Sequence, residues 1–207
     1  MKTTPNVIRF ICLWCAVALL LCLQVATAQT FTTLKSFGIL TNMTGWFPQG
    51  SLAQGGDGAL YGITYSGEGG VQGTIFKVQP NGSGFTVLKH FTSNDGRAPS
   101  AGLTAAGNTL YGTTAYGGST DFGTVFRINT DGTGYTVLKH FTYGNGANPS
   151  AELTRVGGTL YGTTSTEGSS GYGTVFKVNT DGSGFVVLKH FTGSDGSSPL
   201  ARLAQVG

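Results

Sequence analysis

Short stretches of alternating hydrophobic and polar residues follow one another along this chain. In the stretch TVFRIN (124–129), the apolar residues Phe126 and Ile128 are separated by Arg127, which is the two-residue period of a β-strand. Glycine, asparagine, aspartate or proline separates each stretch from the next, as is typical of turns. Residues 29–207 contain no stretch of adequate length with helical spacing. The pattern therefore predicts an all-β protein.

The stretches return with a period of fifty residues. The octapeptide YTVLKHFT at 135–142 has two near copies, at 85–92 and 185–192. One unit, residues 99–142, contains four extended stretches: SAGLTAAG, TLYGTTA, GTVFRINT and YTVLKHF. Four strands in a unit of about fifty residues are typical of a β-propeller blade, so we predict a β-propeller-type fold.

The repeats predict three complete blades and two strands without a blade of their own. The blades span approximately 49–92, 99–142 and 149–192 of a repeat domain that covers 29–207, and the orphan strands are 31–37 and 198–205. A closed propeller needs at least about four blades, so these elements predict an open arc or a fragment of a longer chain. Open blade edges offer a site for self-association.

The connections between strands differ in length and in how well they repeat. An Asp-Gly or Asn-Gly pair joins the third strand to the fourth and predicts a tight hairpin. The second-to-third and fourth-to-first connections are longer and more variable, and in a propeller they emerge on the same face, where we expect any ligand to bind. We expect Leu110, Phe126 and Leu138 to pack between or within blades, and Lys139 or its equivalents to reach solvent.

Several motifs recur within the units: LYGTT at 110–114, a glycine pair at 117–118, GTVF at 123–126 and DG at 131–132. In these motifs the chain resembles the GloVer tandem-repeat family of exported bacterial proteins, which are anchored in various ways. The resemblance covers nearly all of the chain after residue 28. It implies a propeller-like fold, a secreted or surface location and no established activity.

The first 28 residues have the three parts of a secretory signal peptide. Lys2 and Arg9 supply positive charge, 10–23 is an apolar run, and the small-residue triplet ATA ends at Ala28. The run is shorter than the roughly 20 residues that cross a bilayer, which favours cleavage over an uncleaved anchor. We therefore expect a secreted or cell-surface protein, extracellular or periplasmic, with no membrane insertion after cleavage.

Composition and charge restrict the chemistry of the exported chain. All 3 cysteines, Cys12, Cys15 and Cys22, lie in the signal segment, so no disulfide or thiolate metal site is expected. Two of the 12 Lys and Arg residues lie there as well, which leaves 10 against 9 Asp and Glu. So small a net charge gives no electrostatic argument for nucleic acid as a partner.

Two patterns suggest a metal site, and for each we favour a structural role. The histidines His90, His140 and His190 occupy one equivalent position on the outermost strand of successive blades, so the repeat holds them too far apart to share an ion. The NTDG turns resemble calcium loops, but the first copy reads PNG, which favours a hairpin turn over a calcium site. We expect no metal and no cofactor.

Catalysis has little support in the sequence. No GxSxG nucleophile elbow is present, and Glu68, Asp121 and Glu167 lie in second-to-third connections at unequal offsets. The alternative to a non-enzymatic protein is a fragment of a carbohydrate-active propeller enzyme. That alternative requires two carboxylates about 5 to 10 Å apart on one face.

Aromatic and polar residues of the variable connections are the candidates for ligand binding. They are Tyr116, Phe122, Tyr143, Asn145, Tyr172 and Asp195. Rings beside hydroxyls and amides suit saccharides, although the same rings can instead pack between blades. We predict an exported non-enzymatic repeat module that acts as a binding or surface-display scaffold, with an extracellular polysaccharide or a cell-surface molecule as its partner.

Overall fold

The computed structural model describes residues 32–36, 45–67 and 70–206. Apart from Thr32, these residues belong to one compact unit, Thr33–Gly207. The expected signal peptide, residues 1–28, lies outside the described residues. Within them, no helix is both long enough and apolar enough to cross a membrane.

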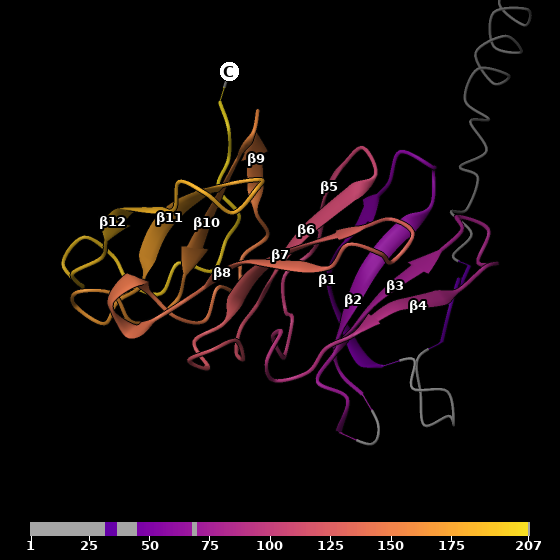
Figure 1. Cartoon of the computed structure of the whole chain (residues 1–207), viewed down its shortest axis with the longest axis horizontal. Coiled ribbons are helices and arrows are strands. Elements are labelled where there is room, and N and C mark those ends of the chain that lie inside the picture. Colours follow the sequence, from indigo (N-terminus) through magenta and orange to yellow (C-terminus); the bar gives the residue numbers. More distant parts are fainter. Residues whose placement is uncertain (1–31, 37–44, 68–69, 207) are drawn as a thin grey trace, which may run out of the picture. The chain divides into compact units, whose positions relative to one another are not determined.

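Three antiparallel sheets of four strands follow one another along the chain (Figure 1). The first sheet (blade 1) consists of β1 (Trp46–Gln54), β2 (Leu60–Ser66), β3 (Thr74–Val78) and β4 (Thr86–His90). Blade 2 consists of β5 (Thr104–Ala106), β6 (Thr109–Thr114), β7 (Thr124–Asn129) and β8 (Thr136–His140). Blade 3 consists of β9 (Thr154–Val156), β10 (Thr159–Thr164), β11 (Thr174–Asn179) and β12 (Val186–His190), and the short 3-10 helix η2 (Tyr143–Asn145) precedes it.

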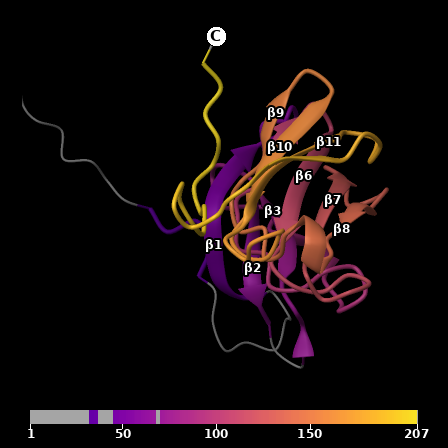
Figure 2. The same ribbon diagram turned by 90° about the vertical axis from the view of Figure 1, so that its left-hand side faces the viewer.

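Within each sheet the strands pair in sequence order, as the predicted meander requires. Equivalent residues pair in every blade: Gly62 with Phe76, Gly112 with Phe126, and Gly162 with Phe176. Seen from the side, successive sheets lie behind one another (Figure 2). The all-β fold with propeller-type blades is thus confirmed.

The core lies between neighbouring blades as well as within them. One buried cluster joins Tyr61 and Phe91 of blade 1 to Phe126 of blade 2. A second cluster joins Phe141 of blade 2 to Phe176 of blade 3. Phe126 belongs to the first cluster and Val125 to the second, so the two faces of β7 pack against different blades. Val125 is therefore fully buried although it alternates with Phe126 along the strand.

The Asp-Gly hairpins form as predicted, and their side chains stabilise the turn. Asp131 Oδ1 accepts hydrogen bonds from Thr133 N at 2.9 Å and from Thr133 Oγ1 at 2.7 Å. Asn81 does the same for Ser83 at 3.0 and 2.8 Å. An uncharged side chain therefore serves in the same place, which supports the hairpin interpretation over calcium.

The two orphan strands differ from the prediction. Residues 32–36, the described part of 31–37, form no strand, and neither do residues 198–205. The physical reason is that a strand requires a ladder of backbone hydrogen bonds, and among the described residues neither segment forms a ladder; Ser198 N makes a single bond, to Tyr172 O at 3.0 Å. Residues near 203 nevertheless occupy the place of a first strand, since Thr154 Oγ1 donates to Leu203 O as Thr104 Oγ1 donates to Leu153 O.

The packing expected within a blade is observed, and the lysine also makes a contact that was not expected. Leu110 and Phe126 are fully buried, and Leu138 is 9% exposed. Lys139 is half-buried and places its Nζ 4.2 Å from the centroid of the Phe185 ring in the next blade, while the side chain of its equivalent Lys189 is 47% exposed. Desolvation at this site lowers the pKa of the Lys139 ammonium. The lysine therefore contributes to the contact between blades 2 and 3.

Candidate functional site

The two variable connections lie together on one face, which we call the loop face. The connection from blade 1 to blade 2 bonds to the second-to-third connection of blade 2, with Gly118 N donating to Ser93 O at 2.8 Å and Arg97 N donating to Tyr116 O at 2.9 Å. Fifty residues later, Gly168 N donates to Tyr143 O at 3.0 Å. These bonds tie each blade to the next, so the loop face is a continuous hydrogen-bonded surface.

Tyr116 lies half-buried beneath an arginine. The guanidinium carbon of Arg97 is 4.8 Å from the centroid of the Tyr116 ring. The same guanidinium donates to both carboxylate oxygens of Asp121, at 3.1 and 2.8 Å, and this contact lowers the pKa of Asp121. One face of the Tyr116 ring is therefore occupied by the protein itself.

Tyr143 is the most exposed aromatic residue of the predicted set, at 62%. Its ring meets Phe122 edge to face, with 6.4 Å between centroids. Asn145 lies two residues further along η2, where its side-chain oxygen accepts a hydrogen bond from Thr142 N at 2.8 Å. Phe122 therefore packs against the Tyr143 ring, and much of that ring is exposed to solvent. The Asn145 side chain stabilises the local turn.

Tyr172, the second exposed ring, is 45% exposed and lies against Gly193. A Cβ atom at position 193 would lie 3.0 Å from the ring, so glycine leaves room for the tyrosine. Asp195 binds Lys189 and accepts a hydrogen bond from Thr192 N at 2.9 Å. The hydrogen bond from Lys189, and to a smaller extent that from the Thr192 amide, lowers the pKa of Asp195 to about 2. Asp195 therefore already has partners within its own blade.

The histidines support the loops of the loop face. His140 Nδ1 accepts a hydrogen bond from Ser119 N at 3.1 Å, and His190 Nδ1 accepts one from Ser169 N at 3.1 Å. Each imidazole thus ties the outermost strand of its blade to the second-to-third connection of the same blade. The neutral tautomer with the proton on Nε2 is required for this bond.

One group of polar residues was not among the sequence-based candidates. Ser51 lies in β1, Glu152 lies two residues before β9, and Arg202 follows Glu152 by fifty residues; Gly102, two residues before β5, takes the corresponding place in blade 2. Ser51 Oγ donates to Glu152 Oε2 at 2.8 Å although blade 2 separates them in the chain, and Arg202 binds Glu152 at 2.7 Å. This inner position carries a different residue in each copy, and that variation was the available signal. Variation outside the loops is therefore informative as well.

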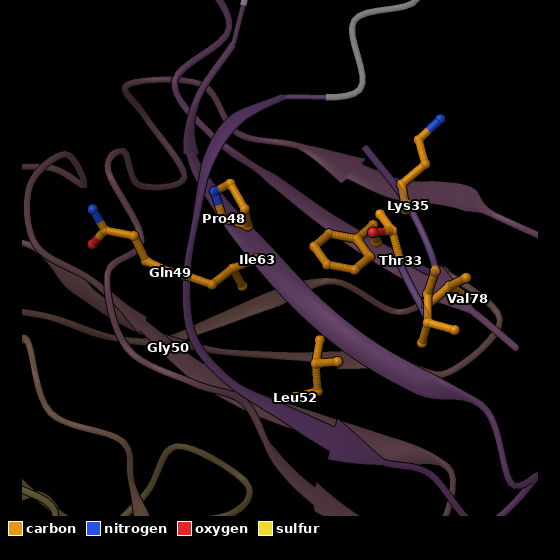
Figure 3. A pocket seen from close by; sticks show the side chains of 10 residues that line it. Thr33, Lys35, Pro48, Gln49, Gly50, Leu52, Ile63 and Val78 are labelled. Atoms are coloured by element: carbon orange, nitrogen blue, oxygen red, sulfur yellow. The ribbon is translucent and has the colours of Figure 1, made fainter. Parts of the chain in front are cut away.

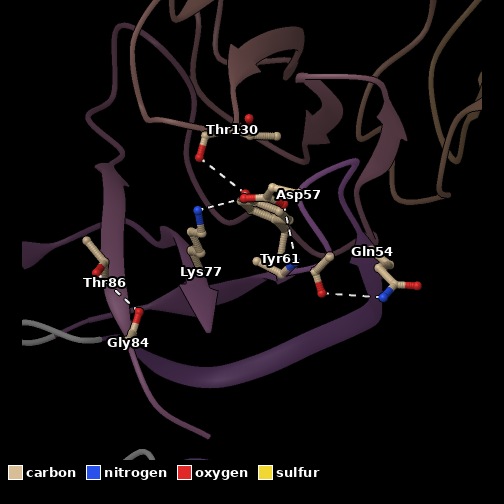
Figure 4. Close-up of polar contacts among 9 residues, drawn as sticks. Gln54, Asp57, Tyr61, Lys77, Gly84, Thr86 and Thr130 are labelled. Atoms are coloured by element: carbon tan, nitrogen blue, oxygen red, sulfur yellow. Dashed lines mark hydrogen bonds and ion pairs between the residues drawn. The ribbon is translucent and has the colours of Figure 1, made fainter. Parts of the chain in front are cut away.

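A polar cluster of blade 1 lies where the hairpin turns emerge, on the side away from the loop face. Tyr61 Oη donates to Asp57 Oδ2 at 2.8 Å, and Lys77 Nζ lies 2.7 Å from the same oxygen (Figure 4). The hydrogen bond from Lys77 and then that from Tyr61 lower the pKa of Asp57 to about 2. Blades 2 and 3 have Gly107 and Gly157 at the position of Asp57, so the cluster is particular to blade 1.

These observations define an all-β repeat protein of the propeller type. The family model of the Gloeobacter/Verrucomicrobia repeat matches residues 22–207, and the chain therefore belongs to that family, as the resemblance in its motifs implied. No curated protein matches the chain.

Two solved structures are similar to the chain at low sequence identity. A chain in the crystal structure of a nidogen/laminin complex matches with a TM-score of 0.54 and 21% identity, over 74% of this chain and 51% of that chain. TolB from Acinetobacter baumannii matches with a TM-score of 0.45 and 14% identity, over 70% of this chain and 32% of that chain. This chain thus spans about half the length of the nidogen/laminin chain, and the likeness concerns the fold alone.

Proposed function

We propose that this protein is an exported, non-enzymatic binding module whose loop face recognises an extracellular polysaccharide at or near the cell surface. The observation that carries the proposal is the exposure of Tyr143 and Tyr172, at 62% and 45%, on connections that belong to one hydrogen-bonded face. Export rests on the N-terminal sequence, and membership of a repeat family with propeller-type blades supports a scaffold role.

The chemistry of the loop face suits a saccharide. A pyranose presents an apolar face of C–H groups, which stacks on an aromatic ring, and its hydroxyls require donors and acceptors nearby. The connections that carry both rings contain exposed hydroxyl-bearing and glycine residues, among them Thr142, Gly144 and Ser170. Because Phe122 supports Tyr143 from within the protein, little side-chain entropy is lost when a sugar stacks on the tyrosine.

The charges of the loop face support a binding role over hydrolysis. Asp95 pairs with Lys89, Asp121 with Arg97, and Asp195 with Lys189. A glycosidase needs one carboxyl group with a raised pKa that can act as an acid, and cationic partners act in the opposite direction. The carboxyl groups of Asp121 and Asp195, whose pKa values these cationic partners lower, are therefore poorly suited to proton donation.

A glycan array probed with the full chain tests the proposal. We expect binding to one class of polysaccharide, and we expect Tyr143→Ala and Tyr172→Ala each to weaken it roughly tenfold, because removal of a stacked ring at a hot spot costs about 1 to 3 kcal/mol. The matched control is Val156→Ala, since Val156 is exposed at a hairpin on the opposite side. If no glycan binds, or if both tyrosine variants bind like the parent while folding normally, the saccharide proposal is wrong.

A further inference from the structure

The contact between neighbouring blades is seen twice in this chain, with equivalent residues. Leu88 of blade 1 packs over the turn at Gly132 of blade 2, where a Cβ would lie 3.3 Å from Leu88 O. Leu138 of blade 2 packs over Gly182 of blade 3 in the same way, at 3.1 Å. Each blade therefore has an outgoing face that carries this leucine and an incoming face that receives it.

Rings and lysines repeat with the leucines. Phe91 meets Phe126 edge to face at 5.3 Å, and Phe141 meets Phe176 at 5.0 Å. The lysine after each leucine lies over a ring of the next blade, which is Tyr135 in one contact and Phe185 in the other. The outgoing face of one blade thus fits the incoming face of the next through a leucine, a lysine and a phenylalanine.

Among the described residues, the corresponding faces of blade 1 and blade 3 are not covered by another blade. On the outgoing face of blade 3, Leu188 is 49% exposed, whereas its equivalent Leu138 is 9% exposed. On the incoming face of blade 1, Leu52 is 50% exposed, whereas its equivalent Leu103 is 2% exposed. Both faces carry core residues that are covered elsewhere in the molecule.

The incoming face of blade 1 is partly covered by residues 33–36, which we call the N-terminal segment. Leu34 lies over Gly82, with its carbonyl oxygen 3.0 Å from the position of a Cβ there, and Lys35 Nζ lies 4.6 Å from the centroid of the Phe85 ring. The sequence TLKS of this segment matches the VLKH of the outer strands. The N-terminal segment therefore occupies the place of an outgoing face.

Beside the N-terminal segment an apolar groove remains. Its volume is about 380 Å³, and Leu34, Pro48, Leu52 and Phe76 are among the residues that line it (Figure 3). Among the described residues, this segment covers the outer part of a surface that a whole blade covers between blades 1 and 2 and between blades 2 and 3. An exposed apolar surface of this kind marks an interaction site.

We propose that a second copy of this chain binds to this surface, with the outgoing face of its blade 3 docked on the incoming face of blade 1. Leu188 and Lys189 of that copy then take the place of Leu34 and Lys35. The two faces are complementary because each carries the residues of an interface that the chain already forms twice. The contact is head to tail, because the outgoing face of one copy meets the incoming face of the other.

Two charge variants test the direction of the contact. Leu188→Asp blocks the outgoing face and Leu52→Asp blocks the incoming face, so neither variant of the full chain should associate with itself. A mixture of the two should form a 1:1 complex, because each supplies the face that the other lacks. Tyr143→Asp, on the loop face, is the control and should associate like the parent. Analytical ultracentrifugation over a range of concentrations measures the parent, the three variants and the mixture.

The N-terminal segment provides a second test. Because Leu34 competes for the same place as Leu188 of the other copy, we expect Leu34→Ala to strengthen association several-fold, whereas a merely structural role of Leu34 predicts weaker association or none. Leu188→Asp should raise the dissociation constant at least roughly tenfold, as for a hot-spot residue. A parent that is monomeric at all concentrations together with a monomeric Leu34→Ala variant, or a mixture that forms no 1:1 complex, overturns the proposal.

Discussion

In the loops, a residue of the second-to-third connection and the residue that it contacts in the fourth-to-first connection change together from one copy to the next. Where blade 1 has Gln72 bonded to Ser93, blade 2 has the Phe122 ring against Tyr143. In blade 3, Tyr172 lies against Gly193. A larger or more apolar residue on one side is met by a suitable partner on the other. Part of the variation in the loops therefore maintains packing, and the exposed rings of Tyr143 and Tyr172 remain available for the proposed recognition of a ligand.

Acid stability should depend on Asp57. Its pKa is lowered from 3.8 to about 2 in the folded protein, so its contribution to stability is present above about pH 4 and is lost as the pH falls through about 2. We expect Asp57→Asn to lower the thermal midpoint at neutral pH, and we expect the difference from the parent to shrink as the pH approaches 2. Thermal unfolding followed by circular dichroism at several pH values measures this.

Lys77→Gln is the matched control for Asp57, because Lys77 is the larger cause of the lowered pKa. The double variant should be little less stable than either single variant, since both remove the same contact. A difference between Asp57→Asn and the parent that stays constant across the pH range would contradict the assignment.

The second strand of every blade contains a glycine that is required by packing within the sheet and is not part of a turn. A Cβ at Gly62, Gly112 or Gly162 would lie 2.5 to 2.6 Å from the Cζ atom of the phenylalanine paired with it on the third strand. The ring thus lies over the glycine backbone, which compensates for the missing side chain. This contact accounts for the glycine of the LYG motif, for which the alternating pattern of a strand offers no reason.

Adding a methyl group at Gly112 should destabilise the protein. Phe126 is fully buried and Leu103 is 2% exposed, so neither can move aside, and we expect Gly112→Ala to cost about 1 to 3 kcal/mol of unfolding free energy. Gly62→Ala should cost less, because Leu52 on the open face of blade 1 has room to move. Gly158→Ala is the control, since a Cβ at position 158 would have no neighbour within 4 Å. Urea denaturation gives the order, and equal costs for all three variants would contradict this account.

The molecule as a whole is a row of blades in which each one contacts its neighbours. Its two core clusters join blade 1 to blade 2 and blade 2 to blade 3. In such a protein, stability is approximately a sum of blade and interface contributions. Among the described residues, blade 1 has no blade before it and blade 3 has none after it. Each therefore leaves one interface unfilled, and the proposed head-to-tail contact fills both.

The proposed export concerns the whole chain and has a direct test. We expect a bacterium that expresses the full chain to release a protein that begins at Gln29, because the apolar run and the triplet ending at Ala28 match the requirements of signal peptidase. Ala28→Leu should reduce cleavage, and Thr30→Leu, outside the triplet, should not. Mass spectrometry of the periplasmic and extracellular fractions decides, and exported material with an intact N-terminus would refute cleavage after Ala28.

Much of the fold could be predicted, and less of the site. The strands, the Asp-Gly hairpins and the two connections that share a face follow from local patterns that recur every fifty residues. The roles of Asn145 and Asp195 could not be predicted, because their partners are the Thr142 and Thr192 amides, and the geometry of a turn decides whether a side chain reaches them. The contact of Ser51 with Glu152 was equally hidden, since 101 residues separate them.

The amino-acid sequence alone is sufficient for the all-β class, the four-stranded unit and its period, because alternation and turn chemistry act between residues close in the chain. The burial of Val125, the place of Lys139 over Phe185, and the convergence of Ser51, Glu152 and Arg202 depend on how blades stack. Stacking brings together residues that are a repeat or more apart, and no local pattern encodes those distances. The exposed leucines of the terminal blades also become visible only when the covered and uncovered copies of one position are compared in space.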